Sequence, residues 1–181
     1  LHRRGLVAFN RGQLDDARKL LNEARALYVK ASGERSVDVS AVEASLGTVE
    51  RQAGDLDAAE KHHQLAFAID KELRGELHPD LARDLHNLAG LARLRGELGD
   101  ALDLYTQALH IEVKSRGKDS VQAALTHNSI GLVHMATGNF AYATTEIATA
   151  RDAFRIAGHG DFAFTEHNLG IIRAAVGESG G

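Results

Sequence analysis

The chain has 181 residues, a formal net charge of −4 at neutral pH and no cysteine. This charge balance provides no basic surface for nucleic acid or for an anionic membrane, so we expect neither as a partner. The absence of cysteine excludes a disulfide framework, a thiolate metal site and a cysteine nucleophile. It is also compatible with a reducing compartment, and we predict a cytoplasmic location.

No run of apolar residues approaches the roughly 18 that a membrane helix needs. The first residues also lack the charged-then-apolar order of a signal peptide. The sequence begins with Leu1 and opens in the middle of a repeat. We therefore expect it to be a fragment of a longer protein, in which any catalytic or targeting domain would lie outside this sequence.

The sequence repeats itself every 42 residues. The stretch NLAGLARLRGELGDAL at 87–102 recurs as SLGTVERQAGDLDAAE at 45–60 and as SIGLVHMATGNFAYAT at 129–144. The same spacing separates Gly12, Gly54, Gly96 and Gly138. A protein built from such repeats buries its apolar surface between neighbouring repeats and has no single centre.

Each repeat predicts two helices joined by a glycine turn. In the third repeat, Pro79 begins the first helix, where its missing amide hydrogen costs nothing. Gly96 ends that helix, since glycine tolerates a positive φ, and the second helix runs on to Gly117. The apolar stripe of this second helix consists of Ala101, Leu104, Tyr105, Ala108, Leu109 and Ile111.

The same division predicts one all-α array over residues 1–178. Its parts are a first repeat at 1–32 with a truncated first helix, repeats at 36–74, 79–116 and 120–157, and a lone final helix at 161–176. This gives about nine helices, followed by a tail at 179–181.

Small residues recur at one place in the first helices and at one place in the second helices. These places hold Gly47, Ala89, Gly131 and Gly170 in the first helices, and Ala17, Ala59, Ala101 and Ala143 in the second. A larger side chain at a helix crossing overpacks it, which costs roughly 1–3 kcal/mol. Because glycine in a helix is about 1 kcal/mol less favourable than alanine, we expect close helix contacts at these places.

The order Leu88, Ala89, Gly96, Ala101, Tyr105 and Ala108 resembles the tetratricopeptide repeat, a helix–turn–helix unit. The long period, with HPDLARDLHNLAGL and YTQALHIEVKSRG, is similar to the version found in kinesin light chains and in many bacterial regulatory proteins. HEAT and armadillo repeats have a similar period, but they do not explain the recurring small residues. The resemblance implies a right-handed superhelical solenoid of antiparallel helix pairs.

In tetratricopeptide arrays, the first helices line a concave side that usually binds peptides. By this resemblance, the concave side of the chain carries Arg51, Arg83, His86, Asn87, Arg93, Asn128, Met135, His167 and Asn168. An asparagine amide can donate to and accept from a peptide backbone, and arginine suits carboxylates, so we expect an extended and acidic ligand. The alternative is that these polar residues only solvate the inner wall.

No motif predicts catalysis, a cofactor or a metal site. His62 and His63 are adjacent and so point about 100° apart on a helix, and no His-Glu-x-x-His pattern occurs. Acidic residues such as Asp15, Asp16 and Asp55 gather at the starts of second helices, where the helix dipole accounts for them. We therefore expect a protein that is not an enzyme.

Two functions remain open from the sequence. The first is a protein–protein interaction module that binds a peptide or an extended protein segment in the concave groove. The second is a structural array that associates with itself through the last helix, or packs on another domain of a larger signalling protein. The second is suggested by apolar residues on a helix that has no following partner, namely Phe162, Phe164, Leu169, Ile172 and Val176.

Overall fold

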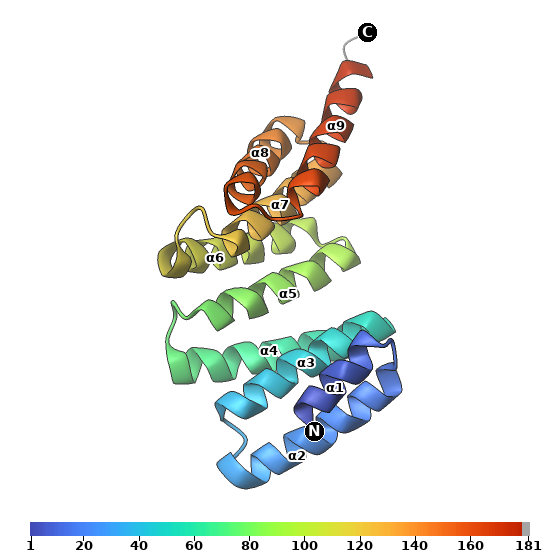
Figure 1. The fold of residues 1–181 in the computed structure, drawn as a ribbon, viewed down its shortest axis with the longest axis vertical. Coiled ribbons are helices and arrows are strands. Elements are labelled where there is room, and N and C mark those ends of the chain that lie inside the picture. The colour runs from blue at the N-terminus through green and yellow to red at the C-terminus, as the bar shows by residue number, and fades with distance from the viewer. Residues whose placement is uncertain (179–181) are drawn as a thin grey trace. The chain divides into compact units, whose positions relative to one another are not determined.

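The computed structural model describes residues 1–178, and the predicted tail at 179–181 lies outside the described residues. Within the described part, the chain forms nine α-helices and no strand (Figure 1). The helices are α1 (His2–Asn10), α2 (Leu14–Ser32), α3 (Val37–Ala53), α4 (Leu56–Arg74), α5 (Pro79–Arg95), α6 (Leu98–Arg116), α7 (Val121–Ala136), α8 (Phe140–Ala157) and α9 (Phe162–Glu178). The prediction of an all-α array of helix pairs is confirmed.

The predicted bounds of the repeats and of the final helix differ from the observed helix ends by two residues at most, and capping residues explain some of the differences. Ser36 and Ser120 stand just before α3 and α7, and their hydroxyls accept hydrogen bonds from the amides of Val39 and Ala123. Asp55 caps α4 in the same way. A capping side chain satisfies an amide that has no partner inside the helix, so these residues lie outside the helices they start.

The glycine turns between paired helices have the predicted geometry. The φ angle is 88° at Gly54 and 74° at Gly138, which is the left-handed region. After Gly54, the amide of Asp55 donates to the carbonyl of Glu50 over 3.0 Å, which closes the end of α3. A non-glycine residue would be strained at this φ, so the glycine sets the reversal between the two helices.

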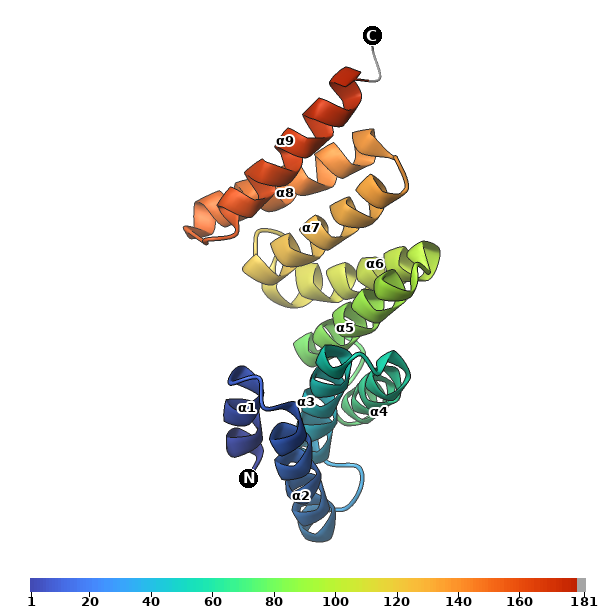
Figure 2. The ribbon, with the colours of Figure 1, turned by 90° about the vertical axis from the view of Figure 1, so that its right-hand side faces the viewer.

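The chain divides into two compact units, Leu1–Leu91 and Ala92–Gly181, with the boundary inside α5. In the first unit, α1, α2, α3 and α4 pack in chain order, and α1 also contacts α3 (Figures 1 and 2). Its core includes Ala8, Ala17, Leu21, Ala24, Val42, Leu46 and Val49. In the second unit, α6, α7, α8 and α9 pack in chain order.

Close helix contacts occur at three of the small-residue places in the first helices. A Cβ on Gly47 would lie 2.7 Å from His63 Nε2, and one on Gly131 would contact Ile147 Cγ1. Gly5, which the sequence analysis did not single out, has the same relation to Leu21, with 2.8 Å to its Cγ. Any side chain at these glycines would force the helices apart.

Gly170 does not follow this rule, so the prediction was wrong there. A Cβ on Gly170 would have no neighbour within 4 Å. The series in the second helices is confirmed, because Ala17, Ala59, Ala101 and Ala143 are all fully buried.

The apolar residues of α9 separate into a packed and an exposed face. Leu169 and Ile172 are buried in a cluster with Ala143 and Ile147 of α8. The sequence predicted that no following helix covers them, and the helix that packs on them is the preceding one, α8. Phe164 and Val176 of the predicted set are exposed, and so is Ile171, which was not in that set.

No helix of the described residues is both long enough and apolar enough to cross a membrane.

Candidate functional site

A groove of about 440 Å³ opens between the first helices of the first unit. Its walls come from α1, α3 and the N-terminal half of α5. The lining residues are His2, Leu6, Phe9, Asn10, Ala41, Ala44, Ser45, Thr48, Arg83 and Asn87.

Helical spacing explains why these residues share one face. On α3, the lining residues Ala41, Ala44, Ser45 and Thr48 are three or four positions apart, so their side chains project from one side of the helix. The remaining sides of α3 are packed against α2 and α4. The groove is therefore the side of α3 that has no second helix against it.

The hydroxyls on the floor of the groove are bonded to their own helix. Ser45 Oγ donates to the carbonyl of Ala41 over 2.8 Å, and Thr48 Oγ1 donates to that of Ala44 over 3.0 Å. Because the Ser45 hydrogen is used in this way, the 2.9 Å contact with His2 Nε2 has the imidazole as donor. Burial lowers the pKa of His2, which favours its neutral form.

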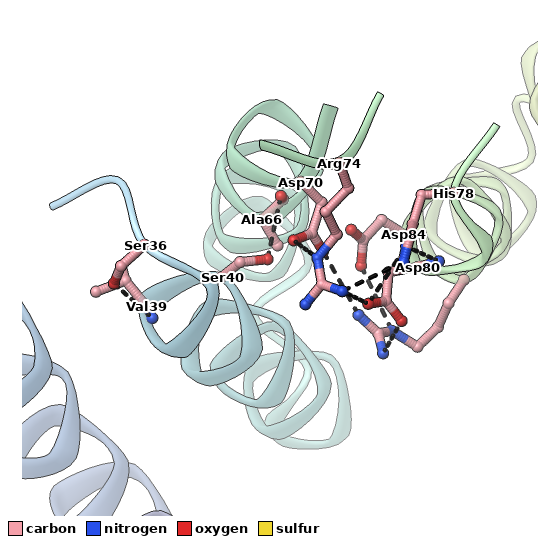
Figure 3. Close-up of polar contacts among 10 residues, drawn as sticks. Ser36, Val39, Ser40, Ala66, Asp70, Arg74, His78, Asp80 and Asp84 are labelled. Atoms are coloured by element: carbon pink, nitrogen blue, oxygen red, sulfur yellow. Dashed lines mark hydrogen bonds and ion pairs between the residues drawn. The ribbon is translucent and has the colours of Figure 1, made fainter. Parts of the chain in front are cut away.

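One arginine of the groove is held by acidic residues at the junction of α4 and α5. Arg83 NH1 lies 3.0 Å from Asp80 Oδ1, and its NH2 lies 3.8 Å from Asp70 Oδ2. Its Nε is 3.7 Å from Asp84 Oδ1. Arg74 contacts both Asp70 and Asp80 over 3.1 Å, so the carboxylates and guanidiniums form one cluster (Figure 3).

Asp84 is the least satisfied member of this cluster. Its side chain is 0% exposed, and neither carboxylate oxygen has a hydrogen-bond partner in the described structure. Burial raises the pKa of Asp84 to about 7, and the charge of Arg83 opposes that rise. Asp70 and Asp80 raise it further, because a second or third negative charge nearby disfavours ionisation.

Among the predicted site residues of the first unit, Arg83 and Asn87 line this groove. They are joined there by Ala44 and Ser45, which precede the same repeat landmark on α3. Arg51 is exposed and His86 is half-buried, and neither lines the groove. The structure thus brings together part of the predicted strip.

In the second unit, two predicted site residues bond to each other. Asn168 on α9 donates from Nδ2 to Asn128 Oδ1 on α7 over 3.3 Å, and Asn168 is only 4% exposed. Met135 packs against the buried cluster of α8 and α9. Arg93 and His167 are exposed. Asn168 and Met135 therefore support packing, whereas Arg93 and His167 face solvent.

Sequence reasoning missed the contribution of α1 to the groove. His2, Leu6, Phe9 and Asn10 all line it. The available signal was the repeat itself, since Leu6 and Thr48 are one period apart and both line the groove. The short length of α1, nine residues, makes this equivalence hard to see in the sequence.

Charged pairs elsewhere in the molecule hold second helices to first helices. Glu43 on α3 bonds to Arg25 of α2 and, over 2.6 Å, to His62 of α4. Burial opposes ionisation of Glu43, but the hydrogen bonds from His62 and Arg25 outweigh it and lower the pKa of this carboxyl. Arg18 of α2 contacts both carboxylate oxygens of Glu50 over 2.6 and 2.7 Å. No group of three or more histidines or carboxylates suited to a metal ion occurs among residues 1–178.

A buried histidine stands out in the core of the first unit. His63 is fully buried against Gly47, and neither ring nitrogen has a hydrogen-bond partner among the described residues. Burial lowers the pKa of His63 to about 4, and the nearby charges of Arg51, His62 and Arg83 act in the same direction. This imidazole is therefore neutral and acts as a packing residue.

The family model of the tetratricopeptide repeat matches residues 1–71 and 38–111. The chain belongs to the tetratricopeptide repeat family. Among curated relatives, it is 28% identical over 129 residues to the human "Clustered mitochondria protein homolog" and 26% identical over 138 residues to its counterpart in Aspergillus niger. Each match covers 71% of this chain but only 10% or 11% of the relative, so the chain spans about a tenth of the relatives it matches.

Solved tetratricopeptide structures share the fold. BtubC (BKLC) from P. vanneervenii superposes with a TM-score of 0.86 at 21% identity, covering 96% of this chain and 70% of that chain. A putative kinesin light chain from Podosopora anserina, with nearly identical TPR-like repeats, gives 0.80 at 18% identity, covering 98% and 85%. The resemblance to kinesin-light-chain-like repeats is thereby confirmed for the fold. As a class, such arrays are protein–protein interaction modules and typically non-enzymatic scaffolds.

Proposed function

We propose that the chain binds an extended segment of a partner protein in the groove formed by α1, α3 and α5. The observation that carries this proposal is that three successive first helices line one groove of about 440 Å³. A groove of this kind can follow a peptide over several residues, whereas a flat helical surface cannot.

The lining suits a peptide backbone flanked by apolar side chains. The amides of Asn10 and Asn87 can each donate and accept hydrogen bonds, as a peptide unit requires. Leu6 and Phe9 form an apolar wall, and Ala41 and Ala44 leave room on the floor. Ordering a flexible segment costs conformational entropy, so we expect an affinity on the order of micromolar.

The same face of the second unit is a further candidate surface. One place in the repeat holds the lining residues Ala41 and Arg83 in the first unit, and Leu125 and Phe164 in the second. Leu125 and Phe164 are both exposed. His167 is exposed beside the buried Asn168. Together with Arg51, His86 and Arg93, these residues remain candidates for contacts outside the groove.

The test uses a substitution that fills the groove. Thr48→Arg places a long side chain over the groove floor, and Gln64→Arg adds the same charge at an exposed position of α4 as a matched control. Each protein is used to capture partners from a lysate of the source organism, and the captured proteins are quantified by mass spectrometry. A partner that is lost with Thr48→Arg and kept with Gln64→Arg supports groove binding; equal capture by both variants contradicts it.

The alternative function is self-association or packing on another domain through α9. It is favoured by the exposure of Phe164, Ile171 and Val176, at 52%, 45% and 50%. Phe164 and Ile171 are seven positions apart and so share one face of α9, and exposed apolar side chains on one face commonly mark an interaction surface. Sedimentation analysis separates the two functions, because self-association predicts a mass that rises with concentration and falls again with Phe164→Ser and Ile171→Ser.

A further inference from the structure

We propose that the groove between α1, α3 and α5 selects uncharged, apolar segments and disfavours acidic ones, because its arginine is already engaged by three carboxylates. This inference rests on the proposed function and specifies its ligand. It differs from the ligand expected from sequence, which was acidic because several arginines were placed on the concave side.

The Arg83 side chain is half exposed, and its guanidinium lies within ion-pair distance of three carboxylates. The Asp80 carboxylate lies 3.0 Å from one guanidinium nitrogen, and those of Asp70 and Asp84 lie 3.8 and 3.7 Å from the others. The contact with Asp80 is a charge-assisted hydrogen bond, which is stronger than a neutral one, and the two longer contacts are ion pairs. An acidic ligand would have to displace at least one of these partners.

The cluster around Arg83 contains more carboxylates than guanidiniums. Arg74 is the second cation, and it is shared between Asp70 and Asp80. Asp70 is almost fully buried, so solvent screens its charge poorly. A carboxylate of the ligand brought up to Arg83 would meet the negative charge of Asp80 at close range.

The histidine and the hydroxyl residues of the lining do not offer a ligand carboxylate a positive charge or a free hydroxyl hydrogen in place of Arg83. His2 donates its ring hydrogen to Ser45, and burial favours its neutral form. Ser45 and Thr48 donate their hydroxyl hydrogens to their own helix, so these hydrogens are not available to a ligand carboxylate. What the groove offers is apolar surface together with the amides of asparagine side chains.

The experiment pans a displayed library of random peptides against the folded protein. Counter-selection against Thr48→Arg retains only the peptides that need the groove. The expected peptides are rich in Leu, Ile, Val, Phe and Ala, and are depleted in Asp and Glu relative to the library.

Panning the same library on the double variant Asp80→Asn with Asp84→Asn tests whether the carboxylates beside Arg83 cause the depletion of Asp and Glu. These substitutions keep side-chain size and leave Asp70, which Arg74 also contacts, as the remaining carboxylate beside Arg83, so Asp and Glu should return to the selected peptides. Asp15→Asn with Asp16→Asn makes the same change in net charge on α2, outside the groove, and should leave the selection as in the wild type.

Arg83→Ala provides a second test that does not depend on the double variant folding well. If the neighbouring carboxylates balance the charge of Arg83, a selected apolar peptide should bind the variant within about twofold of its affinity for the wild type. If Arg83 instead recognises a ligand carboxylate, the affinity should fall about tenfold or more. Groove-dependent peptides that are rich in Asp or Glu in the wild type, or a tenfold loss with Arg83→Ala, would overturn this inference and leave groove binding intact. Peptides that bind Thr48→Arg as well as the wild type would overturn the proposed function itself.

Discussion

Each unit has a glutamate–histidine contact at the same two positions of the repeat, but the two residue types are exchanged between the helices. In the first unit Glu43 on α3 bonds to His62 on α4, and in the second unit His127 on α7 bonds to Glu146 on α8. Both contacts are 2.6 Å, and each residue of the second pair lies two periods of 42 after its counterpart. The repeat therefore accepts this pair in either direction, and Leu85 and Leu104 hold the same two positions in the repeat between them.

The surroundings of the two pairs differ. The side chain of Glu43 is 1% exposed and has Arg25 as a second partner, whereas that of Glu146 is 26% exposed. A buried carboxylate depends on its partners far more than one that water can reach. The stability of the first unit therefore depends on this buried charge, and the stability of the second unit depends much less on its own pair.

A second comparison concerns the contact between one repeat and the next. Asp70 and Asp84 meet there in the first unit, and Glu112 and Thr126 hold the equivalent positions in the second. Burial raises the pKa of Asp84 and of Glu112 to about 7, and the Thr126 hydroxyl opposes the rise at Glu112. Each unit thus contains one buried acid that binds a proton near neutral pH.

The largest effect is expected from removing the buried acid of the first unit. The pKa of Asp84 is about 7 in the fold and near 3.8 when unfolded, so the contribution of Asp84 to stability is greatest below pH 4 and is lost as pH rises towards 7. The difference corresponds to about 4 kcal/mol, because each unit is worth about 1.4. The stability of Asp84→Asn relative to the wild type should therefore increase from pH 4 to pH 8, as measured by urea unfolding.

Glu112→Gln provides the matched control in the second unit. Its acid also has a raised pKa, so the relative stability of this variant should change with pH in the same direction. If the stability of each variant relative to the wild type does not change with pH, neither acid is protonated in the fold.

The buried histidine should give the opposite pH dependence. His63 has a pKa of about 4 in the fold against 6.5 when free, so its contribution is fully present above pH 6.5 and is lost as pH falls through 4. The loss amounts to about 3 kcal/mol. Leu21 and Ile147 hold the same repeat place, so His63→Leu introduces an aliphatic side chain of the kind found there and should remove this acid sensitivity.

Between pH 4 and 7 the stability of the wild type should fall as pH rises, because Asp84 and Glu112 act in this direction and His63 offsets only one of them. Asp84→Asn should therefore flatten this profile, and His63→Leu should steepen it. If His63→Leu unfolds with the same pH profile as the wild type, the imidazole does not titrate in this way.

The exchanged pairs predict unequal costs for removing their carboxylates. Glu43→Ala should lower the free energy of unfolding by about 2–3 kcal/mol, because hydrogen bonds to a buried charge are lost. Glu146→Ala should cost less than about 1 kcal/mol, because its pair is partly exposed. Denaturant titration compares them directly, and equal losses would contradict the account of buried charge.

The smallest effect concerns two glycines at one repeat place. In Gly131→Ala, the added methyl group meets Ile147, so overpacking outweighs the gain in helix propensity and about 1–2 kcal/mol is lost. In Gly170→Ala, the methyl group meets nothing within 4 Å, so stability should rise by up to about 1 kcal/mol. In thermal unfolding, the midpoint should fall for Gly131→Ala and rise for Gly170→Ala relative to the wild type. Shifts of the same sign would contradict this expectation.

The sequence predicted what depends on local pattern. The helices, the positive φ at Gly54 and Gly138, and the burial of Ala59 and Ala143 follow from periodicity and from backbone sterics. The prediction for Gly170 was wrong because its small size was read as a close contact, while the second helix that would provide that contact is not among the described residues.

The site could be predicted only in part, because a ligand surface depends on what neighbouring helices carry. The repeat register placed Arg83 and Asn87 on the groove, but no local signal shows that Asp70 of α4 reaches Arg83. Nor does the sequence show that Asn168 is buried beside Asn128. Contacts of this kind depend on the packing of separate helices.

The groove of the first unit is proposed to bind a segment of a partner protein. The most direct measurement is isothermal titration calorimetry of a peptide from that segment with the wild type, Thr48→Arg and Gln64→Arg. The account predicts that Thr48→Arg weakens binding by at least about tenfold, whereas Gln64→Arg leaves it unchanged. Equal affinity for Thr48→Arg and the wild type would contradict the account and place binding outside this groove.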